Sequence, residues 1–272
     1  MSGTRTDTDS LATSMRYARE QSDHQKILPA DFEPIAPNNW ASFRYVNGQS
    51  NTFIANDYFR NTLSTTQNLA AIDQPGIDIV RHHYLDANPV YAGASPFVST
   101  HEAAVDLFAN PYVIGWDYQS FGVWATDGYI VARTFGATTP GSALPIIGHA
   151  TFSGKLAGFY VSPTGAGSIV AANVTINADF SNRALSFSSS GTTLTRDAAT
   201  MTAVENLNLS GSLTYSPGAN LFTGTLTNAG GTMNGTSRGQ FYGPAAQELG
   251  GIVTVKSPTT VETLIGAYGA KR

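Results

Sequence analysis

The chain has 272 residues, a net charge of -4 and only 12% charged residues, so it has no basic surface able to neutralise nucleic-acid phosphates or bind an anionic membrane. It contains no cysteine, which excludes disulfides, thiolate metal ligands and a thiol nucleophile. Its start is polar and no run of about 18 apolar residues occurs, so we expect neither a signal peptide nor a transmembrane helix.

Residues 1–35 are polar and are interpreted as a flexible or helical N-terminal segment. The stretch "DSLATSMRYAREQ", residues 9–21, predicts a short helix with Asp9 or Ser10 as its N-cap. Prolines follow this stretch and predict a linker.

Residues 36–111 are rich in aromatic side chains, and we interpret them as a small handle-like module of mixed structure. The sequence "VNGQ", residues 46–49, predicts a hairpin turn. The sequence "HEAAVDLFAN", residues 101–110, follows Ser99 and Thr100 and precedes Pro111, which predicts a short helix.

The stretch "VRHHYLD", residues 80–86, is the most suggestive binding sequence of this module. Neighbouring side chains of a strand point to opposite faces, so His82 and His83 are not expected to chelate one metal ion together. Either histidine, or Tyr84, has the chemistry of an axial haem ligand. The competing interpretation is a surface or hydrogen-bonded histidine pair. Haem is therefore the candidate cofactor, and no metal site is predicted.

The composition changes at Pro111, because residues 1–110 hold 4 of the 27 glycines and carry 7 basic against 12 acidic residues. The Gly-rich remainder predicts many short strands joined by tight turns. Residues 174–187 and 207–226 predict two hairpins, which turn at "SNR" and "SPGAN". A total of roughly eight to ten strands favours a closed antiparallel barrel or a sandwich.

A short pattern with a central glycine recurs as "FSGKL" at 152–156, "LSGSL" at 209–213 and "FTGTL" at 222–226. Glycine at an inward strand position predicts a bend or a close approach of two backbones, as a strongly curved sheet requires. In "GWDYQSFGVW", residues 115–124, the apolar residues alternate as Trp116 and Tyr118 and then, one position out of step, as Phe121 and Val123. This change of register predicts a β-bulge near Ser120. The alternative is that Phe121 and Val123 point outward into the N-terminal module.

The motifs of catalysis are missing from the sequence. No G-x-S-x-G elbow occurs, and the carboxylates of the second half are scattered singly. The Gly-rich "AGGTMNGTSRG", residues 229–239, lies between strands and opens no helix that would bind a phosphate. We expect that the protein is not an enzyme.

The segment "GQFYGPAAQELGGIVTV", residues 239–255, resembles the terminal strand motif of the transferrin-binding protein B β-barrel family. "YQSFGVW", "GHATFSGKLAGFYV", "ADFSNRALSFSSSG" and "LIGAYGAKR" extend the resemblance over residues 112–272. The positions that match the barrel motif are Gly239, Phe241, Gly243, Pro244, Glu248, Gly250 and Gly251.

This resemblance implies a mainly β protein, in which an eight-stranded antiparallel β-barrel at 112–272 follows a smaller mixed handle-like N-terminal module at 36–111. It also implies binding rather than catalysis, because the family includes surface receptors for iron carriers, the factor H binding protein and haemophilin-like secreted haem carriers. Its partner contacts lie in the handle and loops, and no ligand residue transfers by motif. The missing lipobox cysteine departs from the lipoprotein members and favours a secreted or trimmed form.

The motif itself predicts how the barrel closes. Gly243 and Pro244 turn the chain, the two alanines that follow form one helical turn, and Gly250 and Gly251 restart a strand. Glu248 is expected to accept hydrogen bonds from the backbone of this turn or to pair with Arg238.

We therefore expect a bacterial binding protein, extracellular or at the cell surface, that captures haem or an iron-carrying protein partner. The alternative is a structural or adhesive surface protein that docks on another macromolecule through the barrel or the handle, with self-association as one outcome. A membrane-embedded eight-stranded barrel is a third hypothesis, although the sequence lacks aromatic girdles at its strand ends.

Overall fold

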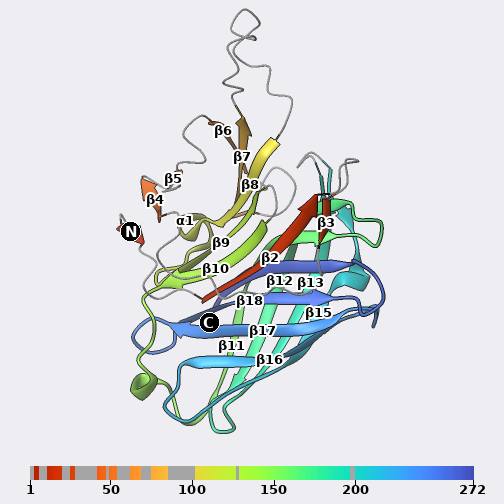
Figure 1. Ribbon diagram of the computed structural model, residues 1–272. Helices are drawn as coiled ribbons and strands as arrows, with labels where there is room; N and C mark the ends of the chain where they lie inside the picture. Colours follow the sequence, from red (N-terminus) through yellow and green to blue (C-terminus); the bar gives the residue numbers. More distant parts are fainter. Residues whose placement is uncertain are drawn as a thin grey trace, which may run out of the picture.

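A computed structural model gives the backbone of residues 3–5, 11–19, 25–27, 42–46, 49–53, 62–68, 75–84, 102–126, 129–196 and 200–272 (Figure 1). It describes the side chains of residues 75–79, 105, 107–111, 113–123, 125, 130, 132–196 and 200–272. Within these ranges the protein is almost entirely β-structure, which confirms the mainly β fold class.

The C-terminal part is a closed antiparallel barrel of eight strands, as expected. Its strands are β11 (His149–Val161), β12 (Gly167–Asp179), β13 (Ala184–Thr195), β15 (Leu209–Tyr215), β16 (Leu221–Asn228), β17 (Asn234–Tyr242), β18 (Glu248–Lys256) and β19 (Thr263–Lys271). Strand β11 pairs with β12 and β19, and β12 also pairs with β13, which closes the ring. The short β14 (Thr202–Ala203) adds to β13, and the helical turn η7 (Glu205–Leu207) follows it.

The two expected hairpins of the barrel are confirmed. In the first, Asp179 pairs with Ala184 across the turn from β12 to β13. In the second, Tyr215 pairs with Phe222, and Gly218 in the intervening turn has φ +72. Alternation accounts for both, because the apolar side chains of each strand point into the barrel and its hydroxyl and amide side chains point out.

Glycines inside the barrel mark close backbone approaches, as the repeated pattern predicts. A Cβ added at Gly154 would lie 1.9 Å from the carbonyl oxygen of Gly269. The same addition at Gly211 or Gly224 would lie 2.0 Å from a backbone oxygen of the neighbouring strand. Only glycine therefore permits this strand spacing.

The N-terminal part forms a seven-stranded sheet in the order β3-β2-β10-β9-β8-β7-β6 (Figure 1). These strands are β2 (Leu11–Arg19), β3 (Gln25–Ile27), β6 (Thr62–Asn68), β7 (Ile77–Tyr84), β8 (Glu102–Ala109), β9 (Gln119–Thr126) and β10 (Tyr129–Gly136). A three-stranded sheet contains β1 (Gly3–Arg5), β4 (Ser42–Val46) and β5 (Gln49–Phe53). The "VNGQ" turn is confirmed, because Val46 pairs with Gln49.

Both helices expected in this part are wrong. The stretch predicted as a helix over 9–21 contains β2, which pairs with β10, and the stretch 101–110 contains β8, which pairs with β7 and β9. Sheet pairing therefore overrides local helix signals. The short helix α1 (Pro111–Ile114) lies just after β8.

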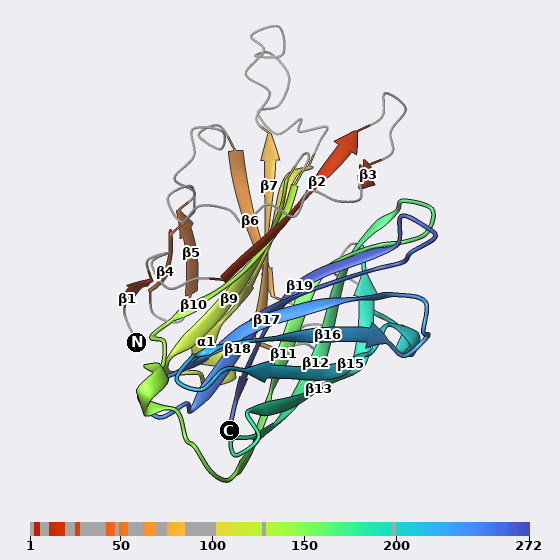
Figure 2. The same cartoon turned by 60° about the horizontal axis from the view of Figure 1, so that its bottom comes forward.

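The seven-stranded sheet packs on the outside of the barrel, against β11, β18 and β19 (Figure 2). Its central residues Ile79, Leu107 and Val123 share a buried apolar cluster with Ile252 and Ile265 of the barrel. Consequently, every position of β18 and β19 except the last is buried. This explains why these strands read as continuous runs of apolar and small residues rather than as alternating ones.

The barrel begins later than residue 112. Strands β9 and β10, which were expected in the barrel, belong to the N-terminal sheet, and the first barrel strand is β11. The bulge expected near Ser120 is absent, because β9 pairs with β10 in continuous register from Gln119 to Thr126. Phe121 and Val123 do lie between the two parts, but they belong to the N-terminal sheet and pack toward the barrel, so the alternative that they point outward from the barrel is wrong as well.

Candidate functional site

The motif at 239–255 builds a joint between the two parts of the molecule. We use this name for the contact of residues 115–119 with β18 and β19. Glu248 is fully buried, and its carboxylate accepts hydrogen bonds from the backbone N–H groups of Asp117 at 2.7 Å, Tyr118 at 3.0 Å and Gln119 at 3.0 Å. The predicted partners, the turn's own backbone or Arg238, are wrong. The carboxylate instead holds the segment that leads into β9.

Burial and hydrogen bonding act on Glu248 in opposite directions. Burial raises the pKa of its carboxyl, whereas the N–H groups of Asp117 and Tyr118 and the charge of Lys271 lower it. Burial is the larger effect, so the pKa lies above its ordinary value. We interpret this buried carboxylate with several amide donors as a structural anchor, because the two charged side chains that act on it, Lys271 and Asp117, pair with each other.

One glycine of β18 and one of β19 leave space for side chains of the joint. The side chain of Gln119 donates to the carbonyl oxygens of Leu249 at 2.7 Å and Ala270 at 3.2 Å. A Cβ at Gly250 would lie 2.2 Å from its Oε1, and a Cβ at Gly269 would lie 2.6 Å from the ring of Trp116. These two glycines, which pair directly across β18 and β19, leave the space that the two side chains fill.

Two polar contacts complete the joint. Lys271 binds the carbonyl oxygen of Gly115 and the carboxylate of Asp117, each at 2.7 Å, and this ion pair raises the pKa of the lysine. On the other side, the hydroxyl of Tyr242 donates to Thr134 of β10 at 2.8 Å. Contacts from β17 and β19 therefore add to those of β18 in tying the barrel to the N-terminal part.

The turn between β17 and β18 agrees in part with its prediction. Gly243 has φ +85 and its added Cβ would meet the ring of Tyr118, so glycine is required there. Residues 243–246 form a hydrogen-bonded turn and not a helical one, with Ala246 buried at φ +56. Gly250 and Gly251 lie within β18, which begins at Glu248.

The predicted ligand residues lie at the end of β7. In the backbone pairing, His82 lies opposite Ala104 and Ser64, and His83 lies opposite Glu102 and Leu63. Tyr84 is the last residue of the strand. The side chains of His82, His83 and Tyr84 lie outside the described residues. Among the side chains that the structure does describe, no group of three His, Cys, Asp or Glu residues could hold a metal ion.

The interior of the barrel is filled with side chains. Phe241 of the motif packs among four aromatic side chains, with ring centroids of Phe152, Phe180, Tyr215 and Phe222 between 5.4 and 6.1 Å away. Phe187 and Tyr268 make a further edge contact at 5.0 Å. A barrel packed in this way holds its own core where a lipocalin-type barrel would hold a ligand. Partner contacts are therefore expected on the outer surface.

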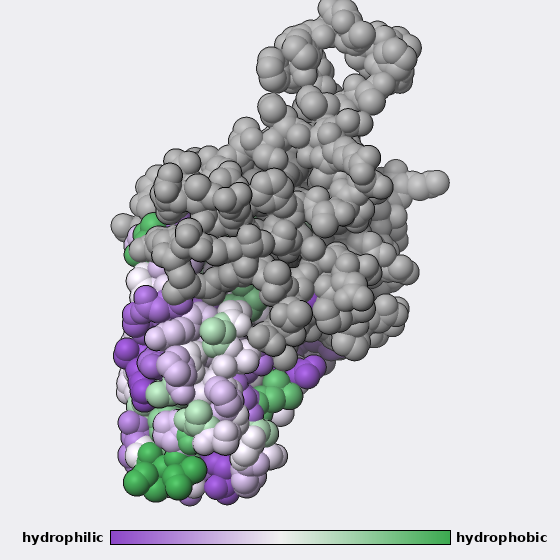
Figure 3. Space-filling model, turned by 90° about the vertical axis from the view of Figure 1, so that its left-hand side faces the viewer, coloured by the Kyte–Doolittle hydropathy of each residue, from purple (hydrophilic) through white to green (hydrophobic). Residues whose placement is uncertain are grey.

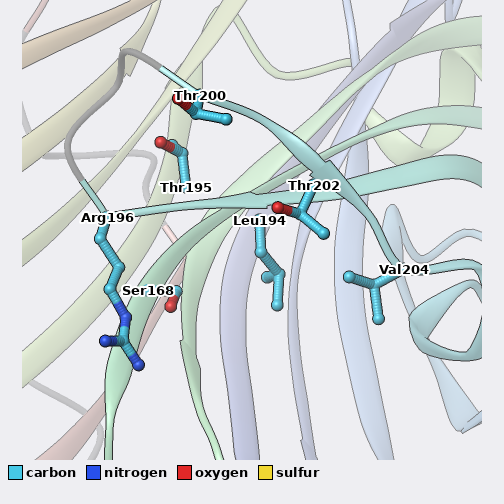
Figure 4. A pocket seen from close by; sticks show the side chains of 7 residues that line it. All are labelled: Ser168, Leu194, Thr195, Arg196, Thr200, Thr202 and Val204. Carbon is cyan, nitrogen blue, oxygen red and sulfur yellow. The ribbon is translucent and has the colours of Figure 1, made fainter.

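An open pocket of about 370 Å³ lies on the barrel wall at the ends of β12 and β13 (Figure 4). Leu194 and Val204 form its apolar floor, and the lining is completed by Ser168, Thr195, Arg196, Thr200 and Thr202. Hydroxyl groups around a small apolar floor suit a weakly bound polar molecule. No pattern in the sequence predicts this pocket, because its residues come together only when β14 pairs with β13.

The opposite end of the barrel is covered by the segment that joins the two sheets. We call residues 137–148 the strap. Within it lies the helical turn η6 (Gly141–Ala143), and two of its side chains are the most exposed large hydrophobic residues of the described chain, Ile146 at 83% and Ile147 at 76%. Figure 3 views this end, where hydrophobic surface gathers at the lower edge.

Residues 144–272 match the family model of the C-lobe and N-lobe β-barrels of transferrin-binding protein B. The match confirms the resemblance that the motif predicts, and its first residue agrees with a barrel that begins after β10. No curated protein matches the chain in sequence. None of the described helices is long and apolar enough to span a membrane.

Solved structures show the same fold. Transferrin binding protein B from Haemophilus parasuis, solved as a single-substitution mutant, is 13% identical with a TM-score of 0.53 and matches 96% of this chain. Intact Ap-TbpB, with its N and C lobes, is 14% identical with a TM-score of 0.51, also over 96% of the chain. The match spans 45% of each of those chains, so this chain covers less than half of their length.

Proposed function

We propose that this chain, whose residues 144–272 form a transferrin-binding protein B-like β-barrel, is a bacterial binding protein at the cell surface or outside the cell that captures an iron-carrying protein. The solved structures of the same fold are named for binding transferrin. The observation that carries the proposal is the filled barrel, because it leaves the outer surface for recognition and a surface suits a protein better than a small solute.

A binding experiment with purified proteins tests this function. The full chain is immobilised and exposed to a panel of iron-loaded and iron-free transferrins from several hosts, with serum albumin as the control. Specific and saturable binding of at least one transferrin is expected. Equal, weak adsorption of all proteins would reject transferrin as the partner and favour the adhesive alternative.

Haem capture is the second candidate. It is supported by the placement of His82, His83 and Tyr84 together at one end of β7. Titration with haemin should then produce a Soret shift that is lost when both histidines are replaced by alanine. An identical spectrum for the wild type and the double variant would exclude both histidines as haem ligands.

A further inference from the structure

The pocket at the ends of β12 and β13 is built on a short pair of strands. Leu194 of β13 pairs directly with Thr202 of β14. Arg196 and Val204, each two positions further along the chain, line the same pocket, as the alternation of side chains in a strand predicts. In Figure 4, Leu194 lies between these two side chains. The pocket therefore has its cation at one end of an apolar floor.

The floor of the pocket is held in place by the barrel. Leu194 and Val204 are partly buried and pack against the apolar cluster of the barrel core. The backbone N–H of Val204 donates to the carbonyl oxygen of Thr192 at 2.8 Å, and the side chain of Asn208 accepts from the N–H and the hydroxyl of Thr192 at 3.1 and 2.7 Å. Thr195, which also lines the pocket, is only 3% exposed. A ligand would therefore meet a preformed surface, and its binding would cost little side-chain entropy.

The polar groups of the pocket offer hydrogen bonds of both kinds. Four of the seven lining residues carry a hydroxyl, namely Ser168, Thr195, Thr200 and Thr202. A hydroxyl can donate and accept, whereas the guanidinium of Arg196 only donates. None of the described lining residues carries a carboxylate. The pocket is therefore suited to a ligand with several hydroxyl groups and at least one strong acceptor oxygen.

The floor and the charges restrict the ligand further. A purely apolar ligand would cover the hydroxyl side chains without bonding them, and a small anion would leave the apolar floor uncovered. The exposed Glu205 follows Val204 in the chain and opposes the charge of Arg196, so the pocket offers no net charge to an anion. The volume of about 370 Å³ lies at the small end of ligand pockets, which suits one ring rather than a chain of rings.

We propose that this pocket binds one N-acetylated amino sugar, the terminal unit of a glycan. Such a sugar presents ring hydroxyls to the hydroxyl side chains, an acetamido carbonyl oxygen to the donors of Arg196, and a methyl group to the floor formed by Leu194 and Val204. The proposal goes beyond the capture of an iron-carrying protein, because it adds an independent binding site at the end of the barrel opposite the strap.

Ligand-observed NMR on the full chain tests this class of ligand. Saturation-transfer difference spectra are recorded with the methyl glycoside of N-acetylglucosamine, with methyl glucoside, which lacks the acetamido group, and with methyl glucosaminide, which carries an amine in its place. The acetamido methyl should receive the strongest saturation, because it would lie on the apolar floor. The other two glycosides should bind roughly tenfold more weakly. Equal binding of all three would overturn the proposal.

Variants test whether the sugar binds in this pocket. Thr202→Val removes an exposed hydroxyl with little change of shape and should weaken binding roughly threefold to tenfold, and Arg196→Gln should do the same. Thr225→Val and Arg238→Gln are the matched controls, because both residues are exposed on β16 and β17, away from the pocket, and should leave affinity unchanged. Circular dichroism checks that each variant is folded. Unchanged affinity in both pocket variants would place the sugar elsewhere and overturn the proposal.

Two sources of this sugar are then compared. One is a serum glycoprotein whose glycans are trimmed to terminal N-acetylglucosamine, and the other is a soluble fragment of bacterial peptidoglycan. Binding of either one that weakens in Thr202→Val but not in Thr225→Val would support the proposal and identify the source. Binding of neither would overturn it. Capture of transferrin is measured separately, so a negative result here leaves the proposed function standing.

Discussion

Glu248 shows how a single residue can look like a functional site and serve as a structural one. Its motif, "GPAAQELGG", places one carboxylate among small residues, and the structure turns that carboxylate toward three backbone N–H groups of another segment. Hydrogen bonds to a buried charge are among the strongest in proteins, and their donors are costly to leave unpaired. The residue therefore matters for how the two sheets are joined.

Replacing Glu248 with alanine should destabilise the protein by roughly 2–4 kcal/mol, because the buried N–H groups of residues 117–119 lose their acceptor. Partner affinity at a temperature where the variant is folded should stay near that of the wild type, since the side chain is fully buried. Urea unfolding gives the first quantity and surface plasmon resonance the second. A selective loss of binding by a stable variant would show that the residue contacts the partner.

The raised pKa of Glu248 has a consequence for the pH dependence of stability. The carboxyl binds its proton more tightly in the folded state than in the unfolded state, whose pKa is near the ordinary 4.5. The protonated group therefore stabilises the fold, and this contribution to the free energy of unfolding is lost as pH rises from 4.5 through the folded pKa. Glu248→Gln removes this titration. The unfolding free energy of the wild type minus that of Glu248→Gln should therefore decrease as pH rises above 4.5 and through the folded pKa. A difference that grows with pH would mean that the three N–H bonds outweigh burial.

At the scale of the strand, glycine positions determine how closely neighbouring strands of the barrel approach each other. Gly154→Ala should cost roughly 2 kcal/mol or more, because its Cβ would enter the backbone of β19 and a backbone oxygen cannot move aside as a side chain can. The neighbouring Ser153→Ala is the matched control, since Ser153 is exposed on the same strand and should change stability little. Equal unfolding midpoints for the two variants would show that β11 and β19 have room to separate.

The sequence predicts the barrel strands better than the N-terminal ones for a physical reason. In β15 and β16, one face meets the core and the other meets water, so alternation marks them clearly. Strand β8 carries "EAAVDLFA", whose alanines and leucine suit a helix, and only its pairing with β7 and β9 makes it a strand. Local preference fails where the partners are distant in sequence.

The candidate surfaces are harder to predict than the strands. The glycine motif identifies the barrel and its closure, but the acceptor role of Glu248 depends on residues 117–119, which lie more than a hundred positions away. The exposure of Ile146 and Ile147 is also hidden in the sequence, because "LPII" reads as buried until the fold shows that only its leucine enters the core. Both features arise from long-range packing.

For the whole molecule, the main question is whether the two sheets act as one body. They share a buried apolar cluster with residues from β7, β8, β9 and β10 on one side and from β11, β12, β18 and β19 on the other. The joint adds directional bonds to this contact, which apolar packing alone lacks. A partner that contacts both the strap and the N-terminal sheet would then bind a preorganised surface. Binding would lose little conformational entropy in fixing the two parts relative to each other.

Calorimetry can test this coupling. The wild type should unfold in one transition, because the buried sides of β18 and β19 would be exposed to water if the N-terminal sheet separated first. Trp116→Ala combined with Glu248→Ala removes the ring over Gly269 and the acceptor of the joint, so unfolding should split into two transitions, with the barrel melting last. Phe241→Ala is the control, since it should cost roughly 3–5 kcal/mol inside the barrel core but keep a single transition. Two transitions in the wild type, or one in the double variant, would mean that the joint does not couple the two sheets. The surface that a partner meets would then change with the orientation of the N-terminal sheet relative to the barrel.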